Sequence, residues 1–303
     1  MESHPRPASP LKWPFVAAIV GVALLSLMDA LMKQASLAAG AYSATLLRSL
    51  VSSAITLPVW LARGSTWPRR PVLKLHLERG AISALMALSF FYSLTKLPLA
   101  EAIAISFVAP LLALYFAHLL LGEQISRAAI WASVLGFAGT LVIVWGRLGR
   151  SDFSNDTALG LASLAFSALL YAYNFTVIRK QSQLAGPLEV ATFQAVISSL
   201  VLALAAPFAF AMPASGSLGT ITGAAALSVT ASMVMAWAYA RAEAQVLVPV
   251  EYTGFLWAAL FGWAFFSEHV TAPTLIGVAI IVVACWIAAP RTRRAPTTET
   301  ANL

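Results

Sequence analysis

The fold class follows from one stretch near the N-terminus, WPFVAAIVGVALLSLMDALM at residues 13–32. A membrane-spanning helix needs about 20 mainly apolar residues, and this stretch has that length. It carries one ionisable residue, Asp29, about two-thirds of the way along. Ionisable groups are costly in hydrocarbon and usually face a bundle interior or a water-filled cavity. The stretch therefore predicts a spanning helix with one polar position that faces inward.

The composition of the whole chain also indicates a membrane protein. The 303 residues are 60% hydrophobic and only 10% charged, with a mean hydropathy of +0.82. A soluble domain carries about 25% charged residues, so a water-soluble surface is excluded. The net charge of +7 does not indicate nucleic acid as a partner, because the basic residues lie at the ends of apolar runs, where they set topology.

Ten apolar segments are long enough to span a bilayer, so we expect an all-α polytopic membrane protein. The charge-free stretch 190–240 is too long for one span, and residues 213–217 supply the turn that divides it. The expected spans are residues 13–36, 42–62, 77–97, 99–121, 127–145, 158–178, 188–212, 218–241, 243–266 and 272–289.

The basic residues between the spans predict the orientation. If the N-terminus is cytoplasmic, most Lys and Arg residues fall in cytoplasmic segments, as the positive-inside rule requires. Both tails, 1–12 and 290–303, are then cytoplasmic, and we expect the protein in a bacterial inner membrane. The residues predicted on the outer side are Lys33, Lys96, Arg147 and Arg150.

The chain contains a weak internal repeat. At an offset of 145 residues, segment 23–29 matches segment 168–174, and at 146 residues Arg48 falls on Gln194. Each half holds five spans, an odd number, so the halves must face opposite ways. Inverted repeats are typical of secondary transporters, with the substrate site near the midplane. The predicted repeats are residues 13–146 and 157–289.

Several matched segments resemble the EamA-type proteins of the drug/metabolite transporter superfamily. They are Pro98–Pro110, Leu119–Glu123, Pro249–Gly254, Gly262–Glu268 and the pair Arg79-Gly80. The resemblance covers nearly the whole chain and implies ten helices around a central cavity. Members of this family include exporters of amino acids and of opine-type metallophores, and carriers for nucleoside-like cofactors. This chain departs from the pattern at Ser267, where a Gly is usual before Glu268.

The resemblance implies an inner-membrane secondary transporter that exports a small polar or amphipathic metabolite, amino-acid-like or an opine-type metallophore, by alternating access. An uptake or exchange carrier for an amino-acid-derived or nucleoside-like cofactor is the alternative. A membrane-embedded enzyme or sensor is a third interpretation. It is disfavoured because the sequence lacks phosphate-loop, metal-site and nucleophile motifs. We expect no cofactor, a small-molecule substrate and the lipid bilayer as partners, and leave a coupling proton open.

Three ionisable residues inside predicted spans are the main site predictions. Asp29 shares a helix face with Lys33, so Asp29 either forms a structural pair with it or lines the transport path. Arg48 either binds an anionic substrate group or pairs with Asp29. Glu251 lies deep in the ninth span beside Pro249, which can kink a helix. We expect Glu251 to bind a substrate amine or to carry a coupling proton.

Other polar and aromatic residues extend this predicted site. Asn174 and Gln194 occupy the repeat positions of Asp29 and Arg48 and keep their polarity without charge. Four aromatic residues lie beside polar or matched positions and are expected to contact an apolar or planar part of the substrate: Tyr92, Tyr173, Trp237 and Tyr252. Four residues near helix ends are expected to have boundary or capping roles: Glu101, His118, Glu123 and Glu268.

Overall fold

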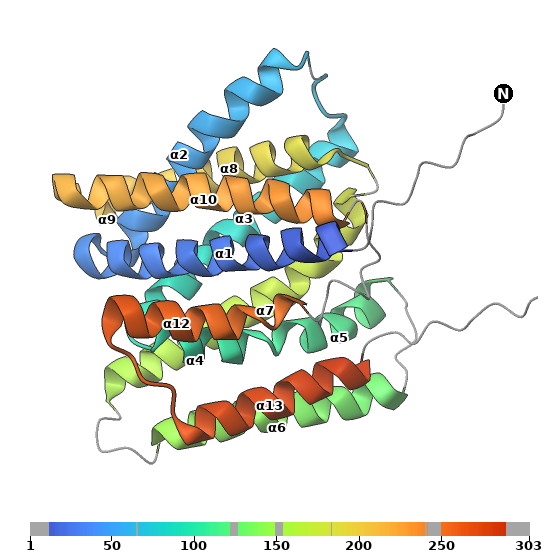
Figure 1. Cartoon of the computed structure of the whole chain (residues 1–303). Helices are drawn as coiled ribbons and strands as arrows, with labels where there is room; N and C mark the ends of the chain where they lie inside the picture. Colours follow the sequence, from blue (N-terminus) through green and yellow to red (C-terminus); the bar gives the residue numbers. More distant parts are fainter. Residues whose placement is uncertain are drawn as a thin grey trace, which may run out of the picture.

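A computed structural model describes residues 12–64, 66–121, 127–148, 154–182, 184–239, 241 and 250–288. All regular structure in these ranges is helical (Figure 1), so the prediction of an all-α fold is confirmed. The helices are α1 (Lys12–Ala39), α2 (Ala41–Ala62), α3 (Arg70–Leu94), α4 (Leu99–Ser106), α5 (Ala109–Leu121), α6 (Arg127–Leu148), α7 (Asn155–Ser182), α8 (Pro187–Ala203), α9 (Ala206–Ala209), α10 (Ser215–Tyr239), α12 (Gly254–Phe266) and α13 (Ala272–Ala288).

Three of the expected spans are interrupted, the seventh of them at a turn over Leu204 and Ala205 between α8 and α9. The fourth span divides into α4 and α5 at a turn over Phe107 and Val108, and Pro110 follows in the first turn of α5. The ninth span has a turn at Tyr252 and Thr253, directly before α12. The proposed break at Pro249 lies outside the described residues. Because Phe107 and Tyr252 are 145 positions apart, the interruptions of the fourth and ninth spans are themselves repeat mates.

The two halves of the chain meet along α1 with α10, α2 with α8, and α3 with α7 and α8. Two pairs of repeat mates touch each other directly in this interface. Ser53 Oγ lies 3.2 Å from Ser199 Oγ. The rings of Phe107 and Tyr252 meet edge to face, with centroids 5.3 Å apart. A residue touches its own mate only near a two-fold axis, so a pseudo-two-fold axis passes between these contacts, as inverted repeats require.

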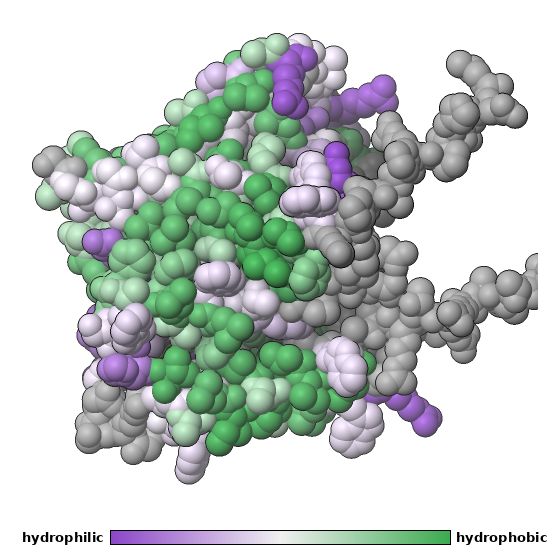
Figure 2. Space-filling model, viewed as in Figure 1, coloured by the Kyte–Doolittle hydropathy of each residue, from purple (hydrophilic) through white to green (hydrophobic). Residues whose placement is uncertain are grey.

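The outer surface is suited to a bilayer. Five stretches are long and apolar enough to cross it, and four shorter apolar helices accompany them among the described residues. Figure 2 shows a broad apolar face over α1, α12 and α13, with hydrophilic residues at its margins. This surface is typical of a multi-pass membrane protein. The five long stretches are residues 13–39, 41–62, 99–120, 155–178 and 216–235.

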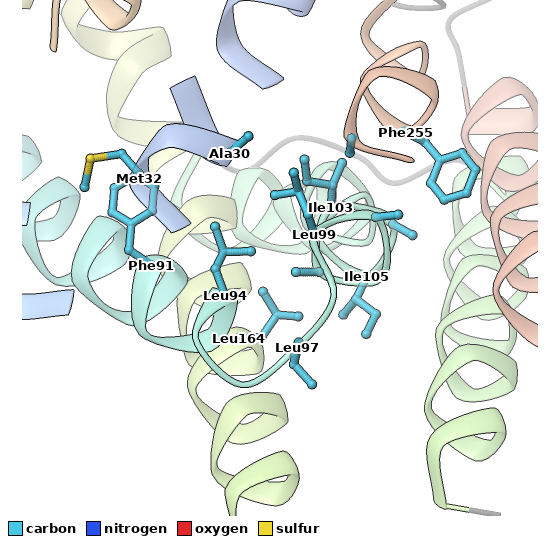
Figure 3. Packing of buried hydrophobic residues seen from close by; sticks show 14 of the residues in the cluster. Ala30, Met32, Phe91, Leu94, Leu97, Leu99, Ile103, Ile105, Leu164 and Phe255 are labelled. Atoms are coloured by element: carbon cyan, nitrogen blue, oxygen red, sulfur yellow. The ribbon is translucent and has the colours of Figure 1, made fainter. Parts of the chain in front are cut away.

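The largest cluster of buried apolar side chains lies where α1, α3, α4, α7 and α12 meet (Figure 3). Met32, Leu94, Leu99 and Leu164 are fully buried in it. Helices α6 and α13 instead pack mainly against each other. They approach so closely that a methyl group at Gly139 would come within 2.7 Å of a backbone oxygen of α13. The interior of the bundle is therefore enclosed by helices other than α6 and α13.

Candidate functional site

A cavity of about 820 Å³ lies between the two repeats. Its wall is formed by α1, α2, α3 and α4 of the first repeat, by α7, α8 and α10 of the second, and by residues 251–254. Sites for small molecules usually have volumes of about 300–1,000 Å³, so this cavity can enclose a metabolite. It is built by segments from nearly the whole length of the chain.

Repeat mates face each other across this cavity. Several mated pairs with offsets of 145 or 146 residues contribute to its lining, among them Arg48 with Gln194, Ser52 with Ser198, Ser83 with Ser228, and Phe107 with Tyr252. The cavity therefore lies on the pseudo-two-fold axis. This position is the one at which inverted-repeat transporters hold their substrates.

The cavity wall is mainly apolar but contains ten serine or threonine residues, and seven of their hydroxyl groups donate to the backbone. A hydroxyl has one proton to donate and two lone pairs, so a serine bonded to a carbonyl offers mainly an acceptor to a ligand. This wall therefore favours a ligand with N–H donors. The hydroxyls that line the cavity and donate to backbone carbonyls belong to Ser26, Ser49, Thr56, Ser106, Ser167, Ser198 and Ser232.

Asp29 from α1 and Arg48 from α2 both face the cavity and interact electrostatically with each other. Within the described part of the chain, neither forms a hydrogen bond or a close ion pair. Arg48 Nε has no hydrogen-bond partner, while its Cζ lies 5.3 Å from the centroid of the Phe91 ring. The N–H groups of the guanidinium thus remain available to a ligand.

Glu251 and Tyr252 line the cavity at the interruption before α12, and Gln194 lines it from α8. Tyr171 lies close enough to Asp29 and Glu251 to interact electrostatically with both carboxylates. Sequence reasoning did not select Tyr171 as a site residue. The internal repeat could have indicated it, because Tyr171 lies in the matched segment 168–174. The site therefore combines one guanidinium, two carboxylates and two phenols.

Lys33 does not pair with Asp29, although the two share a helix face. Its ammonium forms an ion pair with Glu268 and donates to Leu97 O at 2.7 Å. The other oxygen of Glu268 accepts a hydrogen bond from the Leu99 backbone N–H at 2.8 Å. The long lysine side chain lies beside the loop after α3, whereas Asp29 is directed into the cavity. Glu268 therefore has the capping role expected of it, at the start of α4.

Three predicted site residues lie outside the cavity lining. Tyr92 lines a second hollow of about 540 Å³, and Trp237 is 40% exposed beside Arg241. Trp237 lies two residues after the cavity residue Met235, so it points about 200° around the helix axis from it. Asn174 is buried on α7, and its Oδ1 has no hydrogen-bond partner among the described residues.

Of the other residues singled out, Tyr173 donates a hydrogen bond to Glu78. The boundary residue Glu101 is buried and accepts a hydrogen bond from Thr274 at 3.4 Å. His118 is exposed near the end of α5. Glu123 falls outside the described residues.

Comparison with known proteins also indicates a transporter. Residues 12–145 and 158–289 each match the EamA-like transporter family. The pseudopaline exporter CntI of Pseudomonas aeruginosa is 29% identical over 94% of this chain and 98% of its own length. The S-adenosylmethionine uptake transporter of Rickettsia prowazekii is 24% identical over 86% of each. The aromatic amino acid exporter YddG of Ancylobacter novellus is 28% identical over 48% of this chain and 50% of its own length.

A solved structure shares the fold, with a TM-score of 0.62 at 20% sequence identity. The alignment covers 90% of this chain and 96% of the other. Two copies of the family unit occupy nearly the whole sequence, and the cavity lies between them. The chain therefore belongs to the EamA-like transporter family, as a multi-pass membrane transporter and not an enzyme.

Proposed function

We propose that this protein is a secondary transporter that exports a small amphoteric metabolite, amino-acid-like or an opine-type metallophore, across a bacterial inner membrane. The observation that carries the proposal is the cavity on the pseudo-two-fold axis, which presents Asp29, Arg48 and Glu251 together. Alternating access rocks one five-helix repeat against the other around this site.

The chemistry of the cavity supports an amphoteric substrate. The guanidinium of Arg48 makes no hydrogen bond to the described protein and has the fork geometry that binds a carboxylate through two parallel bonds. Asp29 and Glu251 supply negative charge for substrate amines, and the serine oxygens accept further N–H groups. The volume of about 820 Å³ lies in the upper part of the usual range for small-molecule sites. It favours a metabolite larger than a single small amino acid.

The direction of transport is inferred from the relatives. A protein named as a pseudopaline exporter matches almost the whole chain, and an aromatic amino acid exporter matches about half of it. Uptake or exchange of an amino-acid-derived or nucleoside-like cofactor is the second candidate. The observation that favours it is the likeness to an S-adenosylmethionine uptake transporter over 86% of both chains.

Flux measurements in proteoliposomes test the substrate class. The panel contains amino acids, opine-type metallophores and nucleoside-like cofactors, with protein-free liposomes as the control. We expect flux of at least one compound that carries both an amine and a carboxylate. Flux of the cofactors alone would favour the second candidate, and chemical conversion of a compound without its movement would contradict a transport function.

We further propose that both termini are cytoplasmic, because of the distribution of basic residues. Reporter fusions after Leu303 and at Gly216, between the seventh and eighth spans, should report opposite sides of the membrane. If both reporters lie on the same side, the inverted orientation of the repeats is wrong.

A further inference from the structure

A chain of polar side chains joins the two repeats at one end of the cavity. His76 Nε2 lies 2.9 Å from Glu189 Oε1, and Gln181 Nε2 lies 2.7 Å from His76 Nδ1. Arg79 Nη1 donates to Gln181 Oε1 at 3.1 Å. We call these four residues the His76 network. His76 and Arg79 come from α3 in the first repeat, whereas Gln181 and Glu189 come from α7 and α8 in the second.

The direction of each hydrogen bond in the His76 network is set by Arg79. A guanidinium can only donate, so Gln181 must present its oxygen to Arg79 and its NH₂ group to His76. Nδ1 of His76 must therefore be unprotonated and accept that bond. The ring proton is then on Nε2 and is donated to Glu189. His76 is thus neutral and in a single tautomer in this arrangement.

Addition of a proton to His76 changes how strongly the network joins its helices. The proton adds to Nδ1 and places an N–H group against the NH₂ group of Gln181. Gln181 cannot reverse its amide, because Arg79 would then face the NH₂ group. The imidazolium still donates to Glu189, now as a charge-assisted bond, which is stronger than a neutral one. Protonation therefore breaks one of the two bonds of the network between α3 and α7, leaves only the Arg79–Gln181 bond there, and keeps the link between α3 and α8.

The surroundings of the ring hold it in place. Phe193 of α8 stacks on His76 with ring centroids 4.5 Å apart, and Trp60 of α2 meets Phe193 edge to face. His76 is only 1% exposed. The charged groups that face the ring are Glu189 from α8 and, beyond Gln181, Arg79 from its own helix.

A polar route connects the network with the cavity. Arg79 bonds to Gln181 at the level of the network, and Ser167 Oγ donates to Met86 O at 2.9 Å at the level of the cavity. Helices α3 and α7 are therefore antiparallel between these two levels. Both Ser167 and Met86 line the cavity, so this interface leads from the cavity to the network.

Buried polar atoms without a partner lie along this interface. In the described part of the chain, Arg79 Nε, Ser83 Oγ and Asn174 Oδ1 have no hydrogen-bond partner, and each residue is at most 6% exposed. Ser83 also lines the cavity. Buried polar groups are rarely left unsatisfied, and ordered water usually bonds those that proteins do not pair internally. These atoms mark a route along which a proton can pass between the cavity and His76.

We propose that the His76 network is a proton-binding site, separate from the substrate cavity, and that its protonation weakens the attachment of α7 of the second repeat to α3 of the first at this end of the cavity. The network lies near the start of α3, while the Lys33–Glu268 pair lies beside the loop after α3. The two polar clusters therefore flank the cavity at opposite ends. The role of the network in opening one end rests on the transport function proposed above, but its test needs no substrate.

Distances between spin labels test this proposal in the full-length protein in lipid nanodiscs. Labels at Lys74→Cys and Lys180→Cys, both exposed positions, report the separation of α3 and α7. Labels at Lys74→Cys and Gly186→Cys, where a side chain meets no other atom, report α3 and α8. Cys285→Ser removes the native thiol. Between pH 8 and pH 5, we expect a longer α3–α7 population to grow, with α3–α8 unchanged.

Variants identify the group that responds. His76→Gln cannot titrate in this range and should abolish the pH response, whereas His118→Gln, at an exposed position on α5, should keep it. Gln181→Met removes both bonds of the network between α3 and α7 and should show the longer population already at pH 8. The proposal is overturned by a pH-independent α3–α7 distance in the wild type, or by a full pH response in His76→Gln. It is also overturned if Gln181→Met keeps the short distance at pH 8.

Discussion

Arg48→Lys should weaken substrate binding without loss of the fold. Arg48 lines the cavity, and its guanidinium makes no hydrogen bond to the described protein. A lysine keeps the positive charge near Asp29 and can still approach the face of the Phe91 ring, so these two favourable interactions largely remain. What is lost is the planar fork that binds a carboxylate through two parallel hydrogen bonds.

The size of this loss follows from the number of bonds. The arginine guanidinium can make two charge-assisted hydrogen bonds to a carboxylate, whereas the lysine ammonium makes one of comparable strength. A hydrogen bond to a charged group contributes about 1.5–3 kcal/mol. Since about 1.4 kcal/mol corresponds to a tenfold change in affinity, we expect the Kd to rise by roughly 10- to 150-fold.

Equilibrium binding of the compound that proteoliposomes transport measures this effect, with purified wild-type and variant proteins compared at equal expression and equal melting temperature. Arg241→Lys is the matched control. Arg241 lies at the end of α10, where it stacks on Trp237 and donates to the Trp237 carbonyl, so its replacement should leave the Kd unchanged. If Arg48→Lys binds the substrate as tightly as the wild type, Arg48 is not a carboxylate ligand. The cavity would then have no assigned cation for the carboxylate of an amphoteric substrate.

Two further predictions concern stability, measured as thermal unfolding in detergent. Gly80→Ala should destabilise the protein by about 1–3 kcal/mol, because the new methyl group would lie 2.5 Å from Ile197 Cβ and force α3 and α8 apart. The control Gly219→Ala, in open space, should be neutral or stabilising. Equal stability of the two variants would refute the close contact between α3 and α8. Glu268→Gln should cost about 3–5 kcal/mol, because it leaves the buried Lys33 ammonium without its anion. The double variant with Lys33→Met should recover part of that loss, and no recovery would contradict the pairing.

Most of the fold could be predicted from hydropathy alone, because lipid leaves a helix as almost the only structure that satisfies the backbone. The interruption at Phe107 and Val108 could not, since residues 102–117 carry no charged residue and no glycine to mark a turn. Pro110 indicated a kink, but the turn forms where Phe107 packs against its repeat mate Tyr252. That contact joins residues 145 positions apart and has no local sequence signal.

The site was only partly predictable for a related reason. The cost of placing charge in a membrane selected Asp29, Arg48 and Glu251, and all three line the cavity. Sequence position gives the depth of a residue but not the direction in which it points around the helix. Helices that are apolar on most sides provide no polar face to fix that direction, and so Tyr92 and Trp237 were assigned to the cavity but lie outside its lining.

The His76 network could not be found from the sequence, because its members come from three helices. Within α3, His76 and Arg79 are three residues apart and share one helix face, but this spacing alone does not identify a partner. Their partners Gln181 and Glu189 lie more than 100 positions further along the chain. Such pairings become apparent only when the helices are placed in space.

The central claim is that charges in the cavity bind and move the substrate, and Glu251→Gln tests it most directly. Gln keeps the shape of the side chain but cannot ionise. Flux and binding should be measured in proteoliposomes across pH for the wild type, for Glu251→Gln, and for Glu78→Gln, a control outside the cavity that bonds to Tyr173.

We predict that Glu251→Gln reconstitutes normally but loses transport, while Glu78→Gln transports like the wild type. If Glu251 carries a proton, the wild-type flux depends on pH and the Gln variant flattens that profile; if it anchors an amine, the variant binds substrate more weakly throughout the pH range. Flux and binding in Glu251→Gln that equal those of the wild type at every pH would contradict the assignment of this cavity as the transport site.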